Sequence, residues 1–265
     1  MDRAPLIIKG RSRFDSGMLK YIPCRECILT SRNRPKSMLE IYEASVKNVR
    51  ELKKQAKVVK LLLNQALRTN RMHEVNALTK TYALMYSAYA EVSFMKLVHT
   101  PHGFHESYIQ QIISCRNLDE KWNKCMEFAF DKISCDHNKG QIANKLKWLR
   151  EMLNDYIIAP SQIRNKIAHG QWNVCLNNNC TAVNADMTIA VSTLDYVQID
   201  RLFTIYGMFS QCVEDLIESP SKAHYRDFYS RLSELEIYIK KTQNYTLESK
   251  QIQLQSSPKH QKRNS

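Results

Sequence analysis

The sequence predicts a mainly α-helical fold, and three observations lead to this prediction. The chain has 265 residues, of which 43% are apolar, so it can bury a substantial core. It contains only 6 Gly and 7 Pro, which leaves few residues for turns and favours long helices. Apolar residues recur every three or four positions through several long stretches. We therefore expect a bundle of helices.

The charge balance is strongly basic, with 39 Lys and Arg against 26 Asp and Glu and a net charge of +13. Such an excess favours polyanionic partners, with RNA and DNA ahead of anionic membrane surfaces. A soluble helical protein with lysine-rich solvated faces has the same composition, so charge alone does not decide between the two explanations.

The sequence does not indicate a targeting signal or a membrane span. Residues 1–20 carry scattered charges and have no apolar region followed by small residues. The most apolar run, at 82–98, contains Glu91 and Lys96 and is too polar to cross a bilayer. We therefore expect a cytoplasmic protein without membrane contacts.

The N-terminal third predicts a basic arm followed by two helices. Residues 1–36 lack apolar periodicity and are rich in Lys and Arg. Such an arm could lie along a phosphate backbone or be only a solvated lead-in to the fold. Helical periodicity then extends over residues 37–68 and 75–98, and the Thr-Pro-His-Gly sequence at 100–103 ends the second run.

Shorter helices are expected next. The first covers residues 109–113, and the second covers residues 118–130. Asn117 is a suitable N-cap for the second helix, and Glu120, three residues later, would complete a capping box.

A longer helix begins near Gln141 and continues towards residue 169. Pro160 lies inside it and should kink or restart the helix, because proline has no backbone N–H. Gly170 can supply the left-handed residue after a helix that ends at His169.

The remaining elements are a hairpin and two helices. Residues 172–176 and 187–191 are expected to form a short β-hairpin, and residues 194–217 a strong helix. The chain would then divide into a basic arm (1–36), a helical extension (37–72), a central domain (73–218), a C-terminal helix (219–245) and a disordered basic tail (246–265).

The 8 cysteines lie mostly within helical patterns, which favours reduced thiols over disulfides. Cys24 and Cys27 form a Cys-x-x-Cys pair, and Cys175 and Cys180 flank an Asn-rich turn. The four thiolates could bind structural zinc only if the arm folded onto the hairpin. Because the second spacing is loose, we expect no metal and no other cofactor.

Residues 164–169, Arg-Asn-Lys-Ile-Ala-His, are the strongest functional candidate. Arg164 offers a planar fork for phosphate oxygens, and His169 can exchange protons near neutral pH. The spacing alone is weak evidence, because Arg68 and His73 repeat it in a polar stretch between two helices. Only the copy at 164–169 has an apolar pair, Ile167 and Ala168, before the histidine and a glycine stop, Gly170, directly after it.

These features resemble the HEPN superfamily, whose signature is an Arg, a polar residue and then a His at this spacing. The resemblance covers roughly residues 75–217, including the order of two helices, a motif helix, a small β insertion and a closing helix. Glu91 and Trp122 also occupy positions that look typical of bacterial relatives. The resemblance thus implies a HEPN-type helical bundle with a short β-hairpin and an N-terminal helical extension.

The resemblance further implies a metal-independent RNA endonuclease that acts as a homodimer in a toxin, abortive-infection or antiviral defence role. His169 would act on the ribose 2′-hydroxyl, Arg164 would bind the scissile phosphate, and Asn165 would orient phosphate or histidine. Glu91 and Lys166 would support them. The products would be a 2′,3′-cyclic phosphate and a 5′-hydroxyl.

An antitoxin or another defence-system protein is a further expected partner. Some HEPN toxins carry a Tyr shortly after the His, where modification silences them. Here Gly170, Gln171 and Trp172 occupy those positions. That departure puts control of this kind in doubt.

Other interpretations stay open. The chain could be a HEPN-type module that binds nucleotide or a partner protein without cutting RNA, or a basic nucleic-acid-binding protein with an incidental motif. Arg164 could pair with an acidic neighbour such as Glu91, His169 could only cap the helix end, and Lys166 could face solvent. Residues five apart on an ideal helix point about 140° from each other, so Arg164 and His169 would meet more easily across a dimer.

Overall fold

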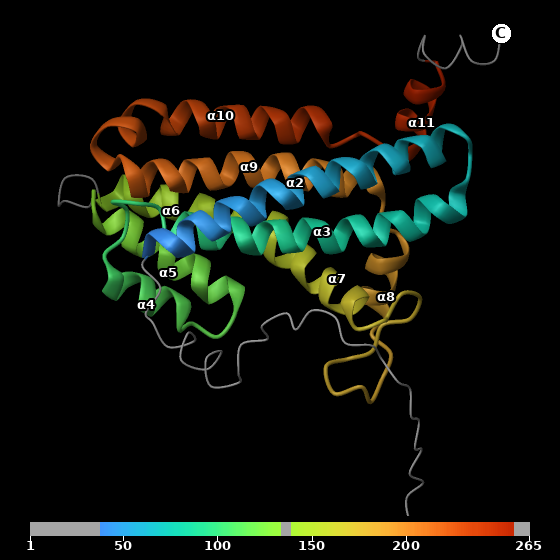
Figure 1. Cartoon of the computed structure of the whole chain (residues 1–265), viewed down its shortest axis with the longest axis horizontal. Helices are drawn as coiled ribbons and strands as arrows, with labels where there is room; N and C mark the ends of the chain where they lie inside the picture. Colours follow the sequence, from blue (N-terminus) through green and yellow to red (C-terminus); the bar gives the residue numbers. More distant parts are fainter. Residues whose placement is uncertain (1–37, 134–138, 257–265) are drawn as a thin grey trace, which may run out of the picture. The chain divides into compact units, whose positions relative to one another are not determined.

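The computed structural model describes residues 38–133 and 139–256. This part of the chain begins with two long antiparallel helices, α2 (Met38–Arg68) and α3 (Met72–Val98) (Figure 1). The turn between them includes Asn70 at a φ of 57°. Buried residues lie on all sides of α3, which places this helix at the centre of the bundle. The second Arg-x4-His sequence, Arg68 to His73, therefore spans a helix–helix turn, as predicted.

Helix α9 (Tyr196–Glu218) packs against α3, and α10 (Tyr225–Thr242) returns antiparallel to α9 (Figure 1). A short π-helical segment, η3 (Pro220–His224), joins α9 to α10. Asp195 caps the start of α9 by accepting a hydrogen bond from the backbone N–H of Gln198 at 2.8 Å. The predicted helix at 194–217 is therefore present with nearly the expected limits.

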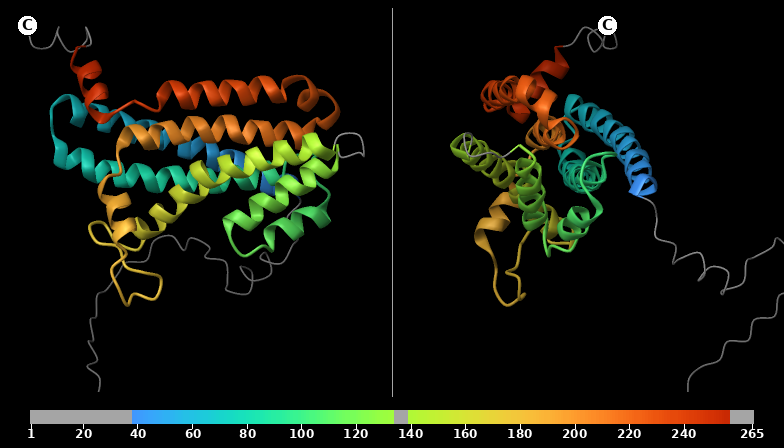
Figure 2. Two further views of the ribbon diagram at one scale, coloured as in Figure 1. Left: turned by 180° about the vertical axis from the view of Figure 1, so that it is seen from behind. Right: turned by 90° about the vertical axis from the view of Figure 1, so that its left-hand side faces the viewer.

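Three helices, α4 (Glu106–Ile113), α5 (Leu118–Asp131) and α6 (Lys139–Leu153), complete the core at one end of the bundle (Figure 2). Asn117 caps α5, as predicted, by accepting the backbone N–H of Glu120 at 2.8 Å. The Glu120 carboxylate accepts the side-chain amide of Asn117 and the backbone N–H of Arg116, rather than the backbone N–H of Asn117 that a capping box would use. Trp122 is fully buried, with its ring centre 4.6 Å from that of Phe94 on α3 and 5.3 Å from that of Phe209 on α9. This aromatic cluster joins α3, α5 and α9.

Helix α6 continues through a π-helical turn, η2 (Asn154–Ile158), into the motif helix α7 (Ala159–Ala168). The irregularity lies just before Pro160, where the sequence predicted a kink. In a regular α-helix the carbonyl of Tyr156 would accept the N–H of residue 160, which proline lacks. The hydroxyl of Tyr86 on α3 donates to this carbonyl instead, at 2.7 Å. The motif helix is thus fixed to the central helix at its start.

The predicted β-hairpin is wrong. Within the described residues the only strand-like pairing in this region is an isolated bridge between Leu176 and Val183. The second expected strand, residues 187–191, belongs to a helix, α8 (Ala185–Ser192). Asn184 accounts for the difference, because its side chain accepts the backbone N–H of Met187 at 3.0 Å and caps that helix.

The C-terminal tail also differs from expectation, because Leu247–Gln255 form a helix, α11. Thr246 and Ser249 form a capping box at its start. Gln251 donates to the carbonyl of Leu67 at 3.1 Å, which holds α11 on the end of α2. Few apolar residues mark this helix, so its periodicity in the sequence is weak.

The described helices all belong to one compact unit, Ser37–Ser265. The basic arm at 1–36 lies outside the described residues. Among the helices that are described, none has the length and apolar character needed to cross a membrane.

Candidate functional site

The motif helix α7 ends with a complete backbone cap. Gly170 adopts a φ of +76°, its N–H donates to the carbonyl of Ile167, and the N–H of Gln171 donates to the carbonyl of Lys166. This pair of bonds is the Schellman arrangement that glycine favours. Backbone N–H groups therefore cap these carbonyls, and the side chain of His169 is not needed for that task. His169 is exposed.

Arg164 points from α7 towards α3, where its Nη2 forms an ion pair with Glu91. About a quarter of the Arg164 side chain is exposed, against half of the Glu91 side chain (25% and 50%). This ion pair is the one expected if Arg164 pairs with an acidic neighbour such as Glu91. The Nε of Arg164 is buried and has no hydrogen-bond partner among the described residues.

Asn165 and His169 lie on a different side of α7 and line a cleft of about 930 Å³. The opposite wall is the loop at 171–184 and the start of α8, which supply mainly amide side chains, together with Cys180 and Met187. This loop projects from the bundle at the end of α7 (Figure 2). The cleft is polar and open, so the His169 imidazole is accessible to a ligand.

Lys166 shapes this cleft. The sequence allowed the interpretation that Lys166 only faces solvent, and the structure differs from it. It is half-buried, and its Nζ donates to the carbonyl of Leu176 at 2.6 Å. The side chain of Gln171 accepts the backbone N–H of Leu176 at 2.8 Å. These two bonds fix the loop over the end of α7. Lys166 therefore holds one wall of the cleft in place.

Trp172 anchors the other side of the loop. Its Nε1 donates to the carbonyl of Ile167 at 3.0 Å, and Lys80 lies 5.6 Å from the centre of its ring. The ring is still 39% exposed, so it is not the core residue that a tryptophan usually is. Ala168 is exposed as well, which leaves Ile167 as the apolar residue that holds the end of α7 to the core.

The predicted site residues thus form two groups. Arg164 and Glu91 meet at the α3 side of α7, whereas Asn165, Lys166 and His169 meet at the loop side. The divergence agrees with the angle of about 140° expected for residues five apart on a helix. Within the described part of one chain, the Arg164 and His169 side chains do not line a common cleft.

Only two of the four cysteines considered for a zinc site lie within the described residues. Cys24 and Cys27 lie outside the described residues. Cys175 is buried, with its Sγ 3.7 Å from the carbonyl of Gln171, while Cys180 is exposed. Both are free thiols.

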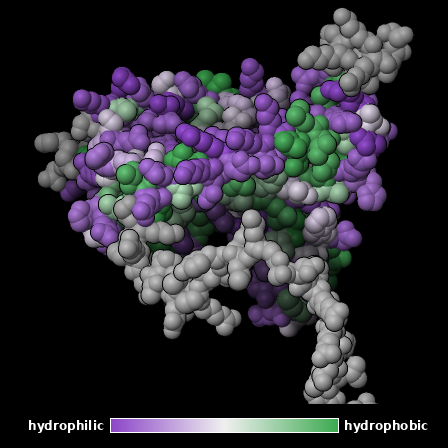
Figure 3. All heavy atoms as spheres, in the orientation of Figure 1, coloured by the Kyte–Doolittle hydropathy of each residue, from purple (hydrophilic) through white to green (hydrophobic). Residues whose placement is uncertain are grey.

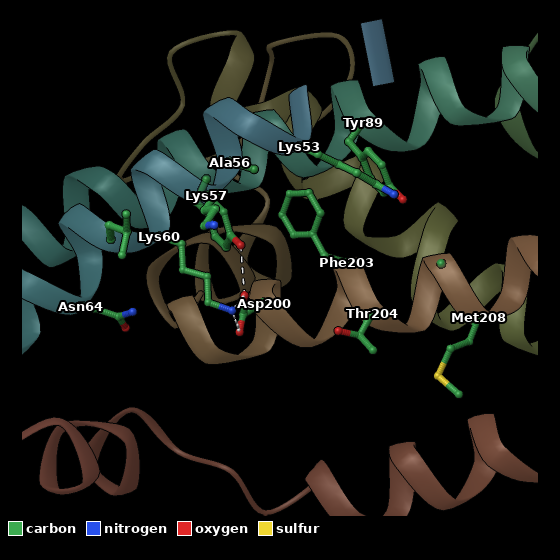
Figure 4. Close-up of a pocket in the computed structure, with 13 residues that line it drawn as sticks. Lys53, Ala56, Lys57, Lys60, Asn64, Tyr89, Asp200, Phe203, Thr204 and Met208 are labelled. Carbon is green, nitrogen blue, oxygen red and sulfur yellow. Dashed lines mark hydrogen bonds and ion pairs between the residues drawn. The ribbon is translucent and has the colours of Figure 1, made fainter. Parts of the chain in front are cut away.

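A second cleft was missed in the sequence. It lies between α2 and α9 and has a volume of about 650 Å³. Lys53, Lys57 and Lys60 line one wall (Figure 4). Their spacing along α2 could have indicated a common face, but the opposite wall comes from residues about 140 positions later in the chain.

Comparison of the sequence and fold with family models, curated proteins and solved structures gives no match.

Proposed function

We propose that this chain is a metal-independent RNA endonuclease of the HEPN type that acts as a homodimer. The observation that carries the proposal is the placement of the motif at the end of α7. An accessible His169 lies over a polar cleft, and Arg164 is held on another side of the same helix by Glu91. A guanidinium and an imidazole are the two groups that cleavage of an RNA phosphodiester most needs.

In the proposed reaction, His169 removes the proton from a ribose 2′-hydroxyl, and the resulting oxygen attacks the adjacent phosphorus. The bond from phosphorus to the 5′-oxygen of the next nucleotide breaks, and that oxygen takes up a proton. The products are a 2′,3′-cyclic phosphate and a 5′-hydroxyl. Arg164 stabilises the negative charge that develops on the phosphate oxygens, and Asn165 orients either the phosphate or the imidazole.

A second copy of the chain would bring the two groups together. Arg164 of one copy and His169 of the other can face one phosphate, although the two side chains diverge within one copy. The surface beside the motif suits such an interface, because several large apolar side chains are exposed there. They are Trp172, Val174, Val183 and Ile189, with exposed fractions of 39%, 52%, 61% and 59%. Exposed apolar groups of this kind often mark protein interfaces.

The central test is cleavage of mixed cellular RNA in EDTA by the wild-type chain and by Arg164→Ala and His169→Ala. Both variants should stay folded and dimeric but lose cleavage. His73→Ala is the matched control, because His73 belongs to the second Arg-x4-His sequence and is exposed. Cleavage that survives both motif substitutions would reject this site. Intact RNA after incubation with the wild-type chain, with and without divalent ions, would instead favour a non-catalytic module that binds nucleotide or a partner protein.

Mixing the two inactive variants tests the shared site directly. In a mixed dimer, one of the two sites keeps both wild-type groups if Arg164 and His169 come from different copies. Random assortment should then restore about a quarter of the wild-type rate. If mixed dimers form, as detected with two affinity tags, and no cleavage returns, Arg164 and His169 do not act across the dimer.

A toxin or antiviral defence role in the cytoplasm, with an antitoxin or other defence-system partner, is the accompanying proposal. Its support is the resemblance of the motif and its context. Expression of the wild-type chain should slow growth of the host cell, and His169→Ala should relieve the effect. Equal growth inhibition by both chains would contradict it.

A further inference from the structure

The cleft between α2 and α9 is distinct from the motif and combines positive charge with aromatic rings. Lys53, Lys57 and Lys60 line it from α2, and Asp200 is the one acidic side chain among its described lining residues. Figure 4 shows these lysines along one wall and Asp200, with Phe203, on the opposite wall. The described lining therefore carries a net positive charge.

Three aromatic rings form the floor of this cleft. The ring of Phe203 lies 4.9 Å from that of Tyr82 and 5.4 Å from that of Tyr89, measured between centres. Tyr82 and Tyr89 belong to α3 and are nearly buried, while Phe203 is half-buried on α9. The Nζ of Lys53 lies 5.5 Å from the centre of the Tyr89 ring. Figure 4 shows the two side chains next to each other. Apolar ring surface and cationic groups thus lie side by side.

The lysines differ in what they already bind. Lys60 is engaged, because its Nζ lies 2.7 Å from the carboxylate of Asp200, which also accepts the hydroxyl of Tyr82 at 3.0 Å. Burial, and then the charge of Asp200, raise the pKa of Tyr82, so its hydroxyl remains a donor. Lys53 and Lys57 are exposed and have no ion-pair partner in the described part of the chain. Those two ammonium groups are available to an anion.

Gly207 leaves the cleft open. It lines the cleft from α9, and a Cβ placed on it would meet no atom within 4 Å. Glycine inside a helix is less favourable than alanine by about 1 kcal/mol, and here no close contact requires it. The glycine therefore keeps space at the floor beside Phe203.

From these features we infer that the cleft between α2 and α9 binds a segment of single-stranded RNA. Lys53 and Lys57 would contact successive phosphates, and a base would stack on the exposed part of Phe203. Basic grooves with aromatic platforms are the usual means by which proteins hold single strands. Asp200, Asn64 and Thr204 could accept hydrogen bonds from bases or ribose hydroxyls. RNA is chosen as the polyanion because of the proposed function.

The chain's own termini do not suit this groove. Residues 1–36 contain nine Lys or Arg against three Asp or Glu, and residues 257–265 contain three Lys or Arg and no acid. Both segments would bring positive charge to a positive wall. An acidic peptide would match the charge of the lysines but would gain little from the aromatic floor.

The hydrophobic surface next to the groove offers a path for single-stranded RNA that leaves the groove over α2. Val58, Leu61 and Leu62 are exposed on the C-terminal half of α2, where Figure 3 shows a hydrophobic patch. Leu61 also lines the cleft. Apolar and aliphatic surface beside a lysine row can contact bases and sugars.

The inference is tested by fluorescence anisotropy with labelled single-stranded RNA about ten nucleotides long, within the usual site size of such grooves. All chains carry His169→Ala, so that cleavage does not interfere. Lys53→Gln with Lys57→Gln should weaken binding about tenfold at low salt and reduce the slope of log affinity against log salt by about 1.4. Lys47→Gln with Lys54→Gln is the matched control, because both lysines are exposed on α2 and lie outside the cleft.

Gly207→Leu provides a test that leaves the charge unchanged. The leucine should fill the floor of the cleft and weaken binding, whereas Gly207→Ala should bind normally and melt at a higher temperature. Equal RNA affinity for the groove and control lysine pairs, or unchanged affinity in a folded Gly207→Leu chain, overturns the inference. So does binding of a glutamate-rich peptide that competes equally with RNA for the groove.

The outcome is separable from that of the ribonuclease proposal, on which the choice of RNA rests. Groove-dependent RNA binding by a wild-type chain that never cleaves RNA rejects the nuclease and keeps the groove. Normal cleavage and normal binding in the groove variants keep the nuclease and reject the groove.

Discussion

Replacing Tyr86 with phenylalanine removes the hydroxyl that donates to the carbonyl of Tyr156 at 2.7 Å, while the ring and its aromatic neighbours stay in place. Tyr86 is only 2% exposed, so water cannot easily replace the lost donor. A buried carbonyl without its partner costs about 1–3 kcal/mol. For a chain of this size each kcal/mol lowers the melting temperature by about 2–4 °C, so we expect a decrease of about 2–12 °C.

The assay is urea or thermal unfolding monitored by circular dichroism, with Tyr245→Phe as the control because Tyr245 is 51% exposed. Pro160→Ala supplies the N–H that a regular helix would offer to the same carbonyl. In a chain that carries Pro160→Ala, Tyr86→Phe should lower the free energy of unfolding by less than about 1 kcal/mol. Wild-type stability of Tyr86→Phe, or an equal cost with and without Pro160, would show that this hydrogen bond does not hold the start of α7.

Three further predictions concern stability, each measured by thermal or urea unfolding. Burial and the nearby Lys145 charge lower the pKa of His224 from 6.5 to about 4, so this histidine is neutral when folded and stability should fall as pH drops from 6.5 towards 4. His224→Phe should make that decline shallower, and an unchanged profile would contradict it. Gly170→Ala should lower the free energy of unfolding by about 1–2 kcal/mol, because the φ of +76° at this position is unfavourable for a residue with a Cβ. Gly103→Ala should cost about 2–3 kcal/mol, since the new methyl would lie 2.7 Å from Ile217, and a neutral result would show that the loop yields easily.

The long helices were predictable because their apolar residues repeat with a helical period over many turns. The cap formed by Asn117 and Glu120 and the stop at Gly170 were also predictable, since local hydrogen bonds determine both. The hairpin was not, because the short, mostly apolar run at 187–191 fits a strand or a helix equally well. Asn184, which selects the helix, lies just before this run.

The site was predictable only in part. The divergence of Arg164 and His169 is a consequence of helix geometry, and Glu91 was among the partners expected for Arg164. The contact between Lys166 and the carbonyl of Leu176 was not predictable, because it depends on the path of a loop. The groove residues were missed for a related reason. Lys60 and Asp200 are 140 positions apart, and only tertiary packing brings them together.

The π-helical turn at 154–158 affects the direction in which the motif faces. A π turn holds one residue more than the α-helical turn it replaces, and each helical residue rotates the downstream part of the helix by about 100°. Deleting one residue from this turn while keeping the helix continuous would swing Arg164 away from Glu91 and His169 away from its cleft. The directions in which Arg164 and His169 point therefore depend on the number of residues in η2, which precedes both of them in the chain. An insertion or deletion there would change the site more than many substitutions within it.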